Sequence, residues 1–250
     1  MTGYQTQQNS ITINGVADLM IRSLRDRQQF FDPLGAAAHL GISSAAWPLF
    51  GLSWPSGLHL AARLARRQVN HLERVLELGC GLGLASLVGH RRGVNITASD
   101  CHPLAARFLR DNSHLNQLSP LPYRHAQWGP EPLALPLPQA EPDLLLSGHF
   151  DLIIASDVLY ERDEAGHLAD YIHRHASPTA EVWIVDPNRG NRAPFCKHMA
   201  RLGYSQREEN LSHAATSHVA AYKGRLLMFW TGAPVAALPQ LTAIDAERSC

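Results

Sequence analysis

The sequence predicts an α/β fold with a mostly parallel central sheet, and three observations support this. Its 250 residues are 45% hydrophobic and 18% charged, enough to bury a large core without a metal or a disulfide. From Arg74 onward, short apolar runs alternate with segments of helical spacing, a pattern typical of parallel strands joined by right-handed crossovers. Three alternating glycines follow the first apolar run, where a strand should end and a helix begin.

The first seventy residues predict a cap on this sheet. Residues 10–13 and 16–21 flank Asn14-Gly15 and predict a hairpin, because Asn-Gly supplies the positive φ angles of a tight two-residue turn. Residues 56–69 carry apolar side chains at helical spacing, with Ser56 as the expected N-cap. We expect this helix to pack against the sheet.

The core is predicted as alternating strands and helices. The predicted strands are 75–78, 94–99, 123–127, 150–156 and 181–185. The predicted helices are 84–91, 103–116, 164–175 and 194–202, with Pro103 at a first helical position. Gly203 is a predicted helix stop, after which 204–208 and 225–230 should form an antiparallel pair that closes the sheet.

A single domain is expected over residues 1–232, with a cap at 10–70 and a core at 71–232. Seven of the 16 prolines lie between Pro120 and Pro142, so this stretch predicts an extended connection within the domain. Residues 233–250 have little periodicity and predict a C-terminal tail.

Composition excludes several classes of protein. Lys plus Arg and Asp plus Glu each total 22, which gives no long-range attraction to nucleic acid or to an anionic membrane. No apolar run approaches 18 residues and the start is polar, so membrane spanning and secretion are not expected. Four cysteines without a C-x-x-C pair predict a cytoplasmic protein, and 14 histidines without H-E-x-x-H predict no metal site.

The strongest motif is the loop from Glu77 to Gly83. Glycines at 79, 81 and 83 let the backbone turn sharply and let a ligand approach the main-chain N–H groups. A dinucleotide site requires G-x-G-x-x-G, but Leu84 or Ser86 occupies the last glycine position in either register. A nicotinamide-dependent oxidoreductase is therefore a poorer fit, and a turn without a ligand is the structural alternative.

Asp100 lies 21 residues after Gly79, at the end of the predicted second strand. A carboxylate there can accept hydrogen bonds from both hydroxyls of a ribose. The loop holds no basic group to balance a pyrophosphate, so S-adenosylmethionine, one adenosine with an amino-acid tail, fits better than a dinucleotide. Trp128 could lie against the adenine and Trp54 could cover the cofactor from the other side, although either could be core.

These residues resemble the seven-β-strand S-adenosylmethionine-dependent methyltransferases and, within them, methyltransferase family 16, which contains protein-lysine methyltransferases. The resemblance covers about residues 10–230. It rests on the segments Gly51–Gly57, Glu77–Gly83, Asp100, Trp128-Gly129 and Ser156–Tyr160. It implies a Rossmann-like class I methyltransferase with a seven-stranded, mostly parallel sheet, an antiparallel closing strand and the hairpin-plus-helix cap.

The resemblance also implies roles for individual residues. The cofactor-binding residues would be Trp54, Glu77, Gly79, Cys80, Gly81, Gly83, Asp100, Trp128 and Ser156, with Asp100 on the ribose and Trp128 beside the adenine. The acceptor would face Asp157 and Tyr160. One departure is Asp186-Pro187-Asn188-Arg189, which is similar to an Asp-Pro-Gly-Arg in the lysine methyltransferases of the electron-transfer flavoprotein β-subunit.

Methyl transfer requires fixed geometry and an acceptor with a free lone pair. A lysine at pH 7 is mostly protonated, and removing that proton costs about 4.6 kcal/mol. A sulfonium and a desolvated channel disfavour the ammonium, whereas Asp157 alone favours it. We therefore expect Asp157 to capture and aim the amine and Tyr160 to close the channel, while helix capping and ordinary packing are their structural alternatives. Arg189 and Arg192 could meet an acidic partner or be solvated.

The function predicted is S-adenosylmethionine-dependent N-methylation of a protein lysine, with S-adenosylhomocysteine as product. Methylation of a small-molecule amine or hydroxyl is the first alternative. A non-catalytic, cofactor-binding interaction protein is the second, because a fold alone does not fix function. The expected partner is a protein substrate, and nucleic acid is not expected.

Overall fold

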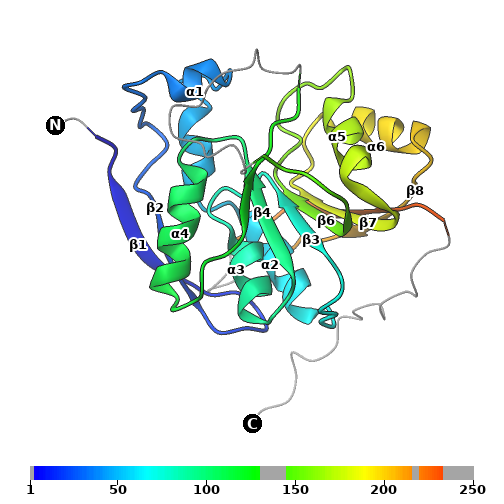
Figure 1. The fold of residues 1–250 in the computed structure, drawn as a ribbon, viewed down its shortest axis with the longest axis horizontal. Coiled ribbons are helices and arrows are strands. Elements are labelled where there is room, and N and C mark those ends of the chain that lie inside the picture. Colours follow the sequence, from blue (N-terminus) through cyan, green and yellow to red (C-terminus); the bar gives the residue numbers. More distant parts are fainter. Residues whose placement is uncertain (1–2, 130–144, 216–219, 233–250) are drawn as a thin grey trace, which may run out of the picture.

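The computed structural model describes residues 3–129, 145–215 and 220–232 (Figure 1). Its main sheet has seven strands in the order β5-β4-β3-β6-β7-β9-β8. The strands are β3 (Val75–Leu78), β4 (Ile96–Asp100), β5 (Tyr123–His125), β6 (Phe150–Ser156), β7 (Ala176–Asp186), β8 (Ser205–Asn210) and β9 (Arg225–Trp230). Strands β3 to β7 pair in parallel, and β9 is antiparallel to both of its neighbours. The predicted Rossmann-like sheet with an antiparallel closing strand is confirmed.

Helices cover both faces of this sheet (Figure 1). Alternate residues of a strand point to opposite faces, so Val75 packs with one hydrophobic cluster and Leu76 with the other. The first cluster includes residues of α2 (Pro55–Arg66), α3 (Leu84–Arg91) and α4 (Ala105–Leu115). The second includes residues of α5 (His167–His175) and α6 (Arg192–Arg201). The sheet is therefore buried on both faces, as its apolar strands require.

The N-terminal hairpin is present, but its turn differs from the prediction. Strand β1 (Thr6–Ile11) pairs antiparallel with β2 (Leu19–Leu24), and Ile11 faces Leu19, so the connection spans residues 12–18. Asn14 and Gly15 form a turn inside this connection, where the Val16 N–H donates to the Ile13 carbonyl at 3.2 Å. The wider loop allows the Ile13 side chain to reach the core, where it is buried.

Strand β2 is joined to α4 by two asparagine side chains. The Oδ1 atoms of Asn112 and Asn116 accept the backbone N–H groups of Arg22 at 2.8 Å and Met20 at 2.9 Å. These amides take the place of a neighbouring strand, so one edge of the hairpin is satisfied by the core of the protein. The hairpin thereby becomes part of the wall that α4 supports.

Several predicted element ends are wrong. Trp54 occupies the N-cap position of α2, and the buried Ser56 hydroxyl lies 2.8 Å from that of Tyr222. Helix α4 begins at Ala105, so Pro103 precedes it. Strand β7 begins five residues before the predicted start at 181, because its outer half continues as an exposed extension of the buried run. Gly203 ends α6 at a φ of 87°, as predicted.

Residues 25–54 contain elements that the sequence patterns did not predict. They include a four-residue helix, α1 (Ala36–His39), and a 3-10 helix, η1 (Trp47–Gly51). In the described part of the chain, no helix has the length and apolar character needed to cross a bilayer, and no group of three or more His, Cys, Asp or Glu side chains forms a metal site. Most of the proline-rich stretch and the predicted tail lie outside the described residues, and the division into cap and core stays a prediction.

Candidate active site

A cavity of about 570 Å³ lies at the carboxyl ends of β3, β4 and β6. In open α/β sheets this edge binds ligands at the point where strand order reverses, and here β4 and β6 flank β3. The volume falls in the usual range for a small-molecule site. Its wall includes the predicted residues Trp54, Glu77, Gly79, Cys80, Gly81, Asp100, Trp128, Ser156, Asp157 and Tyr160.

The glycine loop adopts a conformation that side chains disfavour. Gly79, Gly81 and Gly83 have φ angles of 62°, 52° and 74°. A Cβ on Gly81 would lie 2.7 Å from the backbone oxygen of Phe50, and one on Gly79 would lie 3.0 Å from Val158 Cγ1. The absence of these two side chains keeps the loop closely packed while its backbone lines the cavity.

Gly83 is set apart from the other two glycines. It occupies the N-cap position of α3, and a Cβ there would collide with the Leu109 side chain of α4. The wall of the cavity runs from Gly79 to Gly81 and on through Leu82. The structure thus gives Gly83 a role in helix packing, and its contact with the cofactor stays a prediction.

Asp100 ends β4 and anchors the glycine loop. Asp100 is buried, with only 7% of the residue exposed to solvent. Oδ2 accepts the Gly81 N–H at 2.8 Å, and Oδ1 accepts the His102 N–H at 2.8 Å. Burial raises the carboxyl pKa, while these N–H donors lower it. Because a carboxylate oxygen has two lone pairs, both oxygens can also accept a ribose hydroxyl.

Glu77 supports the loop from beneath. It is buried in the centre of β3, and its Oε2 accepts hydrogen bonds from the Ser86 N–H at 2.8 Å and from the Ser86 hydroxyl. Burial raises the pKa of Glu77 to about 7. Its carboxyl group therefore ties the start of α3 to β3, in addition to lining the cavity.

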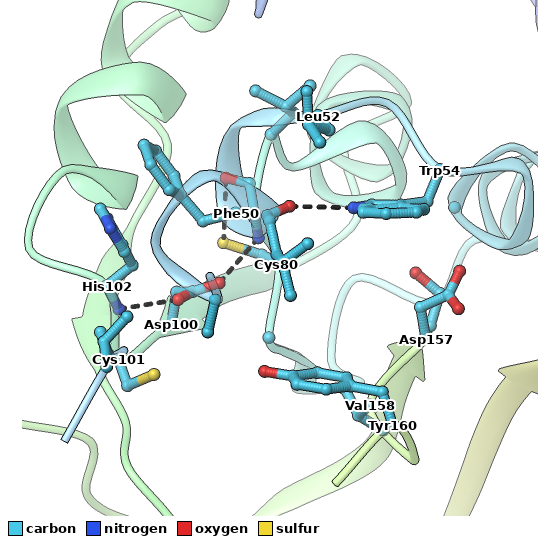
Figure 2. Close-up of a pocket in the computed structure, with 18 of the residues that line it drawn as sticks. Phe50, Leu52, Trp54, Cys80, Asp100, Cys101, His102, Asp157, Val158 and Tyr160 are labelled. Atoms are coloured by element: carbon cyan, nitrogen blue, oxygen red, sulfur yellow. Dashed lines mark hydrogen bonds between the residues drawn. The ribbon is translucent and has the colours of Figure 1, made fainter. Parts of the chain in front are cut away.

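Aromatic side chains build the wall opposite the sheet edge. The Trp54 Nε1–H donates to the Leu49 carbonyl at 2.9 Å, which fixes the indole beside the cavity. The Phe50 ring stacks on His102 with their centroids 3.6 Å apart. Burial lowers the pKa of His102 to about 3, so this ring is neutral. Figure 2 shows three sets of labelled side chains around the cavity: Phe50, Leu52 and Trp54; Asp100, Cys101 and His102; and Asp157, Val158 and Tyr160.

Sequence reasoning missed most of this aromatic wall. Residues from Leu40 to Leu52 and the distant Arg27 line the cavity. They come from segments without regular spacing, so no periodic pattern placed them near the glycine loop. The dipeptide Trp47-Pro48 was one available signal, since Trp47 is buried and holds Phe50 edge to face.

The end of the cavity that is predicted to receive the methyl acceptor is formed after β6. Asp157 has a φ of 57°, and its N–H donates to the Val185 carbonyl at 3.0 Å. Its Oδ1 accepts two hydrogen bonds from Arg189, one from Nη2 at 2.9 Å and one from Nε at 3.3 Å. The Asp157 side chain is 11% exposed and that of Arg189 37%. Arg189 is therefore paired within its own chain while still partly exposed, and its contact with an acidic partner stays a prediction.

The neighbouring residues complete this end. Tyr160 is 45% exposed, so the core does not enclose its ring, and Figure 2 shows the ring across the cavity between Asp100 and Asp157. Burial, followed by the Glu161 charge, raises the pKa of the Tyr160 phenol, which keeps it neutral. Arg192 pairs with Glu208 of β8 at 3.1 Å.

The backbone conformation of Asn188 explains how asparagine can stand where the related motif has glycine. Its φ is 60°, in the left-handed region where glycine is at ease and asparagine is the best-tolerated alternative. Asparagine and glycine therefore support the same backbone turn at this position.

Comparison with known proteins places the chain in a family. Residues 51–201 match the sequence pattern of the lysine methyltransferase family. The chain belongs to this family. An electron transfer flavoprotein beta subunit lysine methyltransferase from Xenopus laevis is 30% identical over 175 residues, which are 65% of this chain and 65% of that protein. A protein N-lysine methyltransferase METTL21A from Danio rerio is 31% identical over 125 residues, 47% of this chain and 52% of that protein.

These matches cover less than two thirds of each relative's length. Among solved structures, the 16S rRNA N2 G1207 methyltransferase RsmC of T. thermophilus has a TM-score of 0.55 at 17% identity, covering 92% of this chain and 52% of that chain. The [4+2]-cyclase SpnF has a TM-score of 0.51 at 14% identity, covering 72% of this chain and 83% of that chain. At such identities the likeness establishes the fold alone. Membership of the family implies S-adenosylmethionine as cofactor.

Proposed function

We propose that this protein is an S-adenosylmethionine-dependent methyltransferase that acts on a lysine side chain of another protein. The observation that carries the proposal is that Asp100 and Asp157 line one cavity, the first at the end of β4 and the second after β6. One carboxylate is placed to hold a ribose and the other to hold an amine. Family membership supports both the cofactor and a protein substrate.

The residues present fit the cofactor. The backbone of Gly79 and Gly81 lines the cavity and can face a ligand's amino-acid portion, and the Asp100 oxygens can accept hydroxyl groups. When bound, S-adenosylmethionine supplies a methyl group on a sulfonium, and transfer forms a C–N bond as the C–S bond breaks. The Trp54 and Trp128 indoles border the cavity and exclude water from its apolar part.

Asp157 and Tyr160 prepare the acceptor. Asp157 binds and aims the amine through a charge-assisted hydrogen bond, and the proton released from the ammonium passes to water. The half-exposed Tyr160 ring lines the cavity beside Asp157, where it is placed to pack against the methylene chain of a lysine. The chain itself supplies geometry and charge, which is all that this displacement requires.

The finer identity of the substrate is also a proposal. Several related proteins are named for the β-subunit of electron transfer flavoprotein, and Asn188 preserves the turn of their Asp-Pro-Gly-Arg motif. This β-subunit is therefore the first purified protein to test. A cytoplasmic location stays a prediction from the cysteine pattern.

A labelling assay tests the proposal. Cell extract, before and after removal of small molecules, is incubated with the enzyme and methyl-labelled S-adenosylmethionine. We expect labelled protein bands that persist after small molecules are removed and that fall by about tenfold or more with Asp157→Asn. Glu164→Gln is a matched control, because this carboxylate is 83% exposed in the same segment. Label confined to small molecules would instead favour the small-molecule alternative.

Thermal unfolding separates the remaining alternatives. S-adenosylhomocysteine should raise the unfolding temperature and NAD should not, because a bound ligand stabilises the folded state. Stabilisation by NAD alone would overturn the cofactor assignment. Stabilisation by S-adenosylhomocysteine without label on any molecule would identify a non-catalytic binding protein.

A further inference from the structure

The carboxylate that should receive the acceptor amine already has a cationic partner. Two nitrogens of Arg189 donate to Asp157 Oδ1, and these residues lie 32 positions apart in the sequence. Both residues line the cavity. An incoming lysine would therefore meet an ion pair, whose charges sum to zero, where the sequence suggested a lone anion.

We infer that Arg189 is a positioning residue that neutralises Asp157 and thereby lets the bound acceptor lysine lose its proton. This inference rests on the proposed function. An isolated carboxylate attracts an ammonium and raises its pKa, which opposes methyl transfer. With Arg189 in place, Asp157 Oδ2, which accepts no hydrogen bond from the described residues, can accept one from the amine. The paired carboxylate nevertheless offers less charge to hold the extra proton.

The backbone holds Arg189 in this position. The Arg189 N–H donates to Asp186 Oδ2 at 2.9 Å, and Asp186 is fully buried at the end of β7. Asn188 supplies the left-handed turn before it, and Asn191 Nδ2 donates to the Leu159 carbonyl at 3.0 Å. The first bond fixes Arg189 against the end of β7, and the Asn191 bond ties the loop after β7 to the loop after β6.

Other ionisable groups around the pair do not supply this effect. Burial raises the pKa of Asp186 and raises that of Tyr222 to about 12, and it also raises that of Tyr160, so both phenols are neutral at pH 7–10. Burial lowers the pKa of His59, which packs on Tyr222, so that ring is neutral as well. The other charged side chains that line the cavity with the pair are Arg27, Glu77, Asp100 and the exposed Glu161, and the nearby Arg192 pairs with Glu208.

Two consequences distinguish this role from simple support of the fold. Without Arg189, Asp157 would bind the ammonium more strongly, so the complex should form at lower enzyme concentration. The bound lysine would also keep its proton to a higher pH, so the maximal rate should fall most at neutral pH. Loss of a merely structural contact would lower the rate by a similar factor at every pH.

Single-turnover labelling of the extract band measures both quantities. Enzyme is held in excess over the labelled protein, and the limiting rate constant at saturating enzyme is recorded from pH 7 to 9.5. This constant reports ionisation in the bound complex. For Arg189→Ala we expect the rising limb to move up by about one pH unit, which corresponds to a loss of about tenfold at pH 7 and near recovery at pH 9.5.

Two further variants serve as controls. Arg189→Lys retains the positive charge but loses the two-nitrogen contact, so its rising limb should lie between those of the wild type and Arg189→Ala. Arg192→Ala removes an arginine three residues away that pairs with Glu208, and it should leave the profile unchanged. Stabilisation of each variant by S-adenosylhomocysteine shows that the fold and the cofactor end are intact.

The outcomes separate this inference from the proposed function. A constant ratio of Arg189→Ala to wild type across the pH range, or a shift to lower pH, would overturn the role of Arg189 while lysine methylation stands. If the wild-type enzyme labels no protein, the proposed function fails and the inference fails with it.

Discussion

The two ends of the cavity are built in different ways. At the cofactor end, Asp100 is held by backbone N–H groups of Gly81 and His102, which lie within twenty residues of it. At the acceptor end, Asp157 is held by the side chain of Arg189 from another loop. The first arrangement depends on backbone geometry that a short motif encodes. The second depends on a long-range side-chain contact that no motif spacing reveals.

Among the variants that test this difference between the two ends, those in the glycine loop should have the largest effect. Gly81→Ala would place a Cβ against the backbone oxygen of Phe50 at an unfavourable φ, so affinity for S-adenosylhomocysteine should fall by at least about tenfold. Gly83→Ala is the matched variant, because the three atoms nearest its Cβ belong to the Leu109 and Ser86 side chains and not to the backbone. Titration calorimetry and thermal unfolding should show weaker binding for the first variant and a stability loss with retained binding for the second. Equal losses of affinity in Gly81→Ala and Gly83→Ala would contradict this difference between the two glycines.

The two carboxylates should separate binding from transfer. Asp100→Asn removes a charged acceptor from the ribose position, and we expect S-adenosylhomocysteine to bind about tenfold more weakly. Asp157→Asn should leave that affinity within about twofold and abolish most labelling of protein. Calorimetry and the labelling assay on the same two proteins measure this. Weak binding by Asp157→Asn would show that the two ends are not independent.

Stability should depend on pH through Glu77. Burial raises its pKa from an ordinary value of 4.5 to about 7, so the folded protein binds more protons than the unfolded chain between these values. The contribution of Glu77 to the free energy of unfolding should therefore be greatest below pH 4.5. It should decline by at most about 3 kcal/mol as pH rises to 7. Denaturant unfolding of Glu77→Gln should show a shallower decline. Glu164→Gln, altered at an exposed site, should keep the wild-type slope.

The smallest effects are expected at Asn188. Asn188→Gly should change the free energy of unfolding by less than about 0.5 kcal/mol and retain activity, because both residues accept a positive φ. Asn188→Ala should cost about 1 kcal/mol at the same position. Chemical denaturation with the labelling assay would test both. Equal costs for the two variants would show that the asparagine side chain, and not the turn, is what matters.

Periodic segments were predicted well. Strand β6 and helix α3 begin and end where their apolar patterns predict, because each is a continuous, mostly buried run. The hairpin turn and the N-cap of α2 were predicted wrongly. Burial of Ile13 overrides the local preference at the turn, and the contact between Ser56 and Tyr222 overrides it at the N-cap. Of the candidate site residues, those on the motif loops meet at one cavity, whereas the wall from residues 40–52 carries no periodic signal.

The sequence by itself determined the alternation of strands and helices, the left-handed glycine loop and the two acidic strand ends, because each is encoded within a few consecutive residues. Only the tertiary structure decided that Gly83 packs on Leu109, that Arg27 reaches the cavity and that Arg189 pairs with Asp157. Such contacts join residues far apart along the chain. Their partners are selected by the folded shape, where distance in space and burial, and not spacing in sequence, set the strength of each interaction.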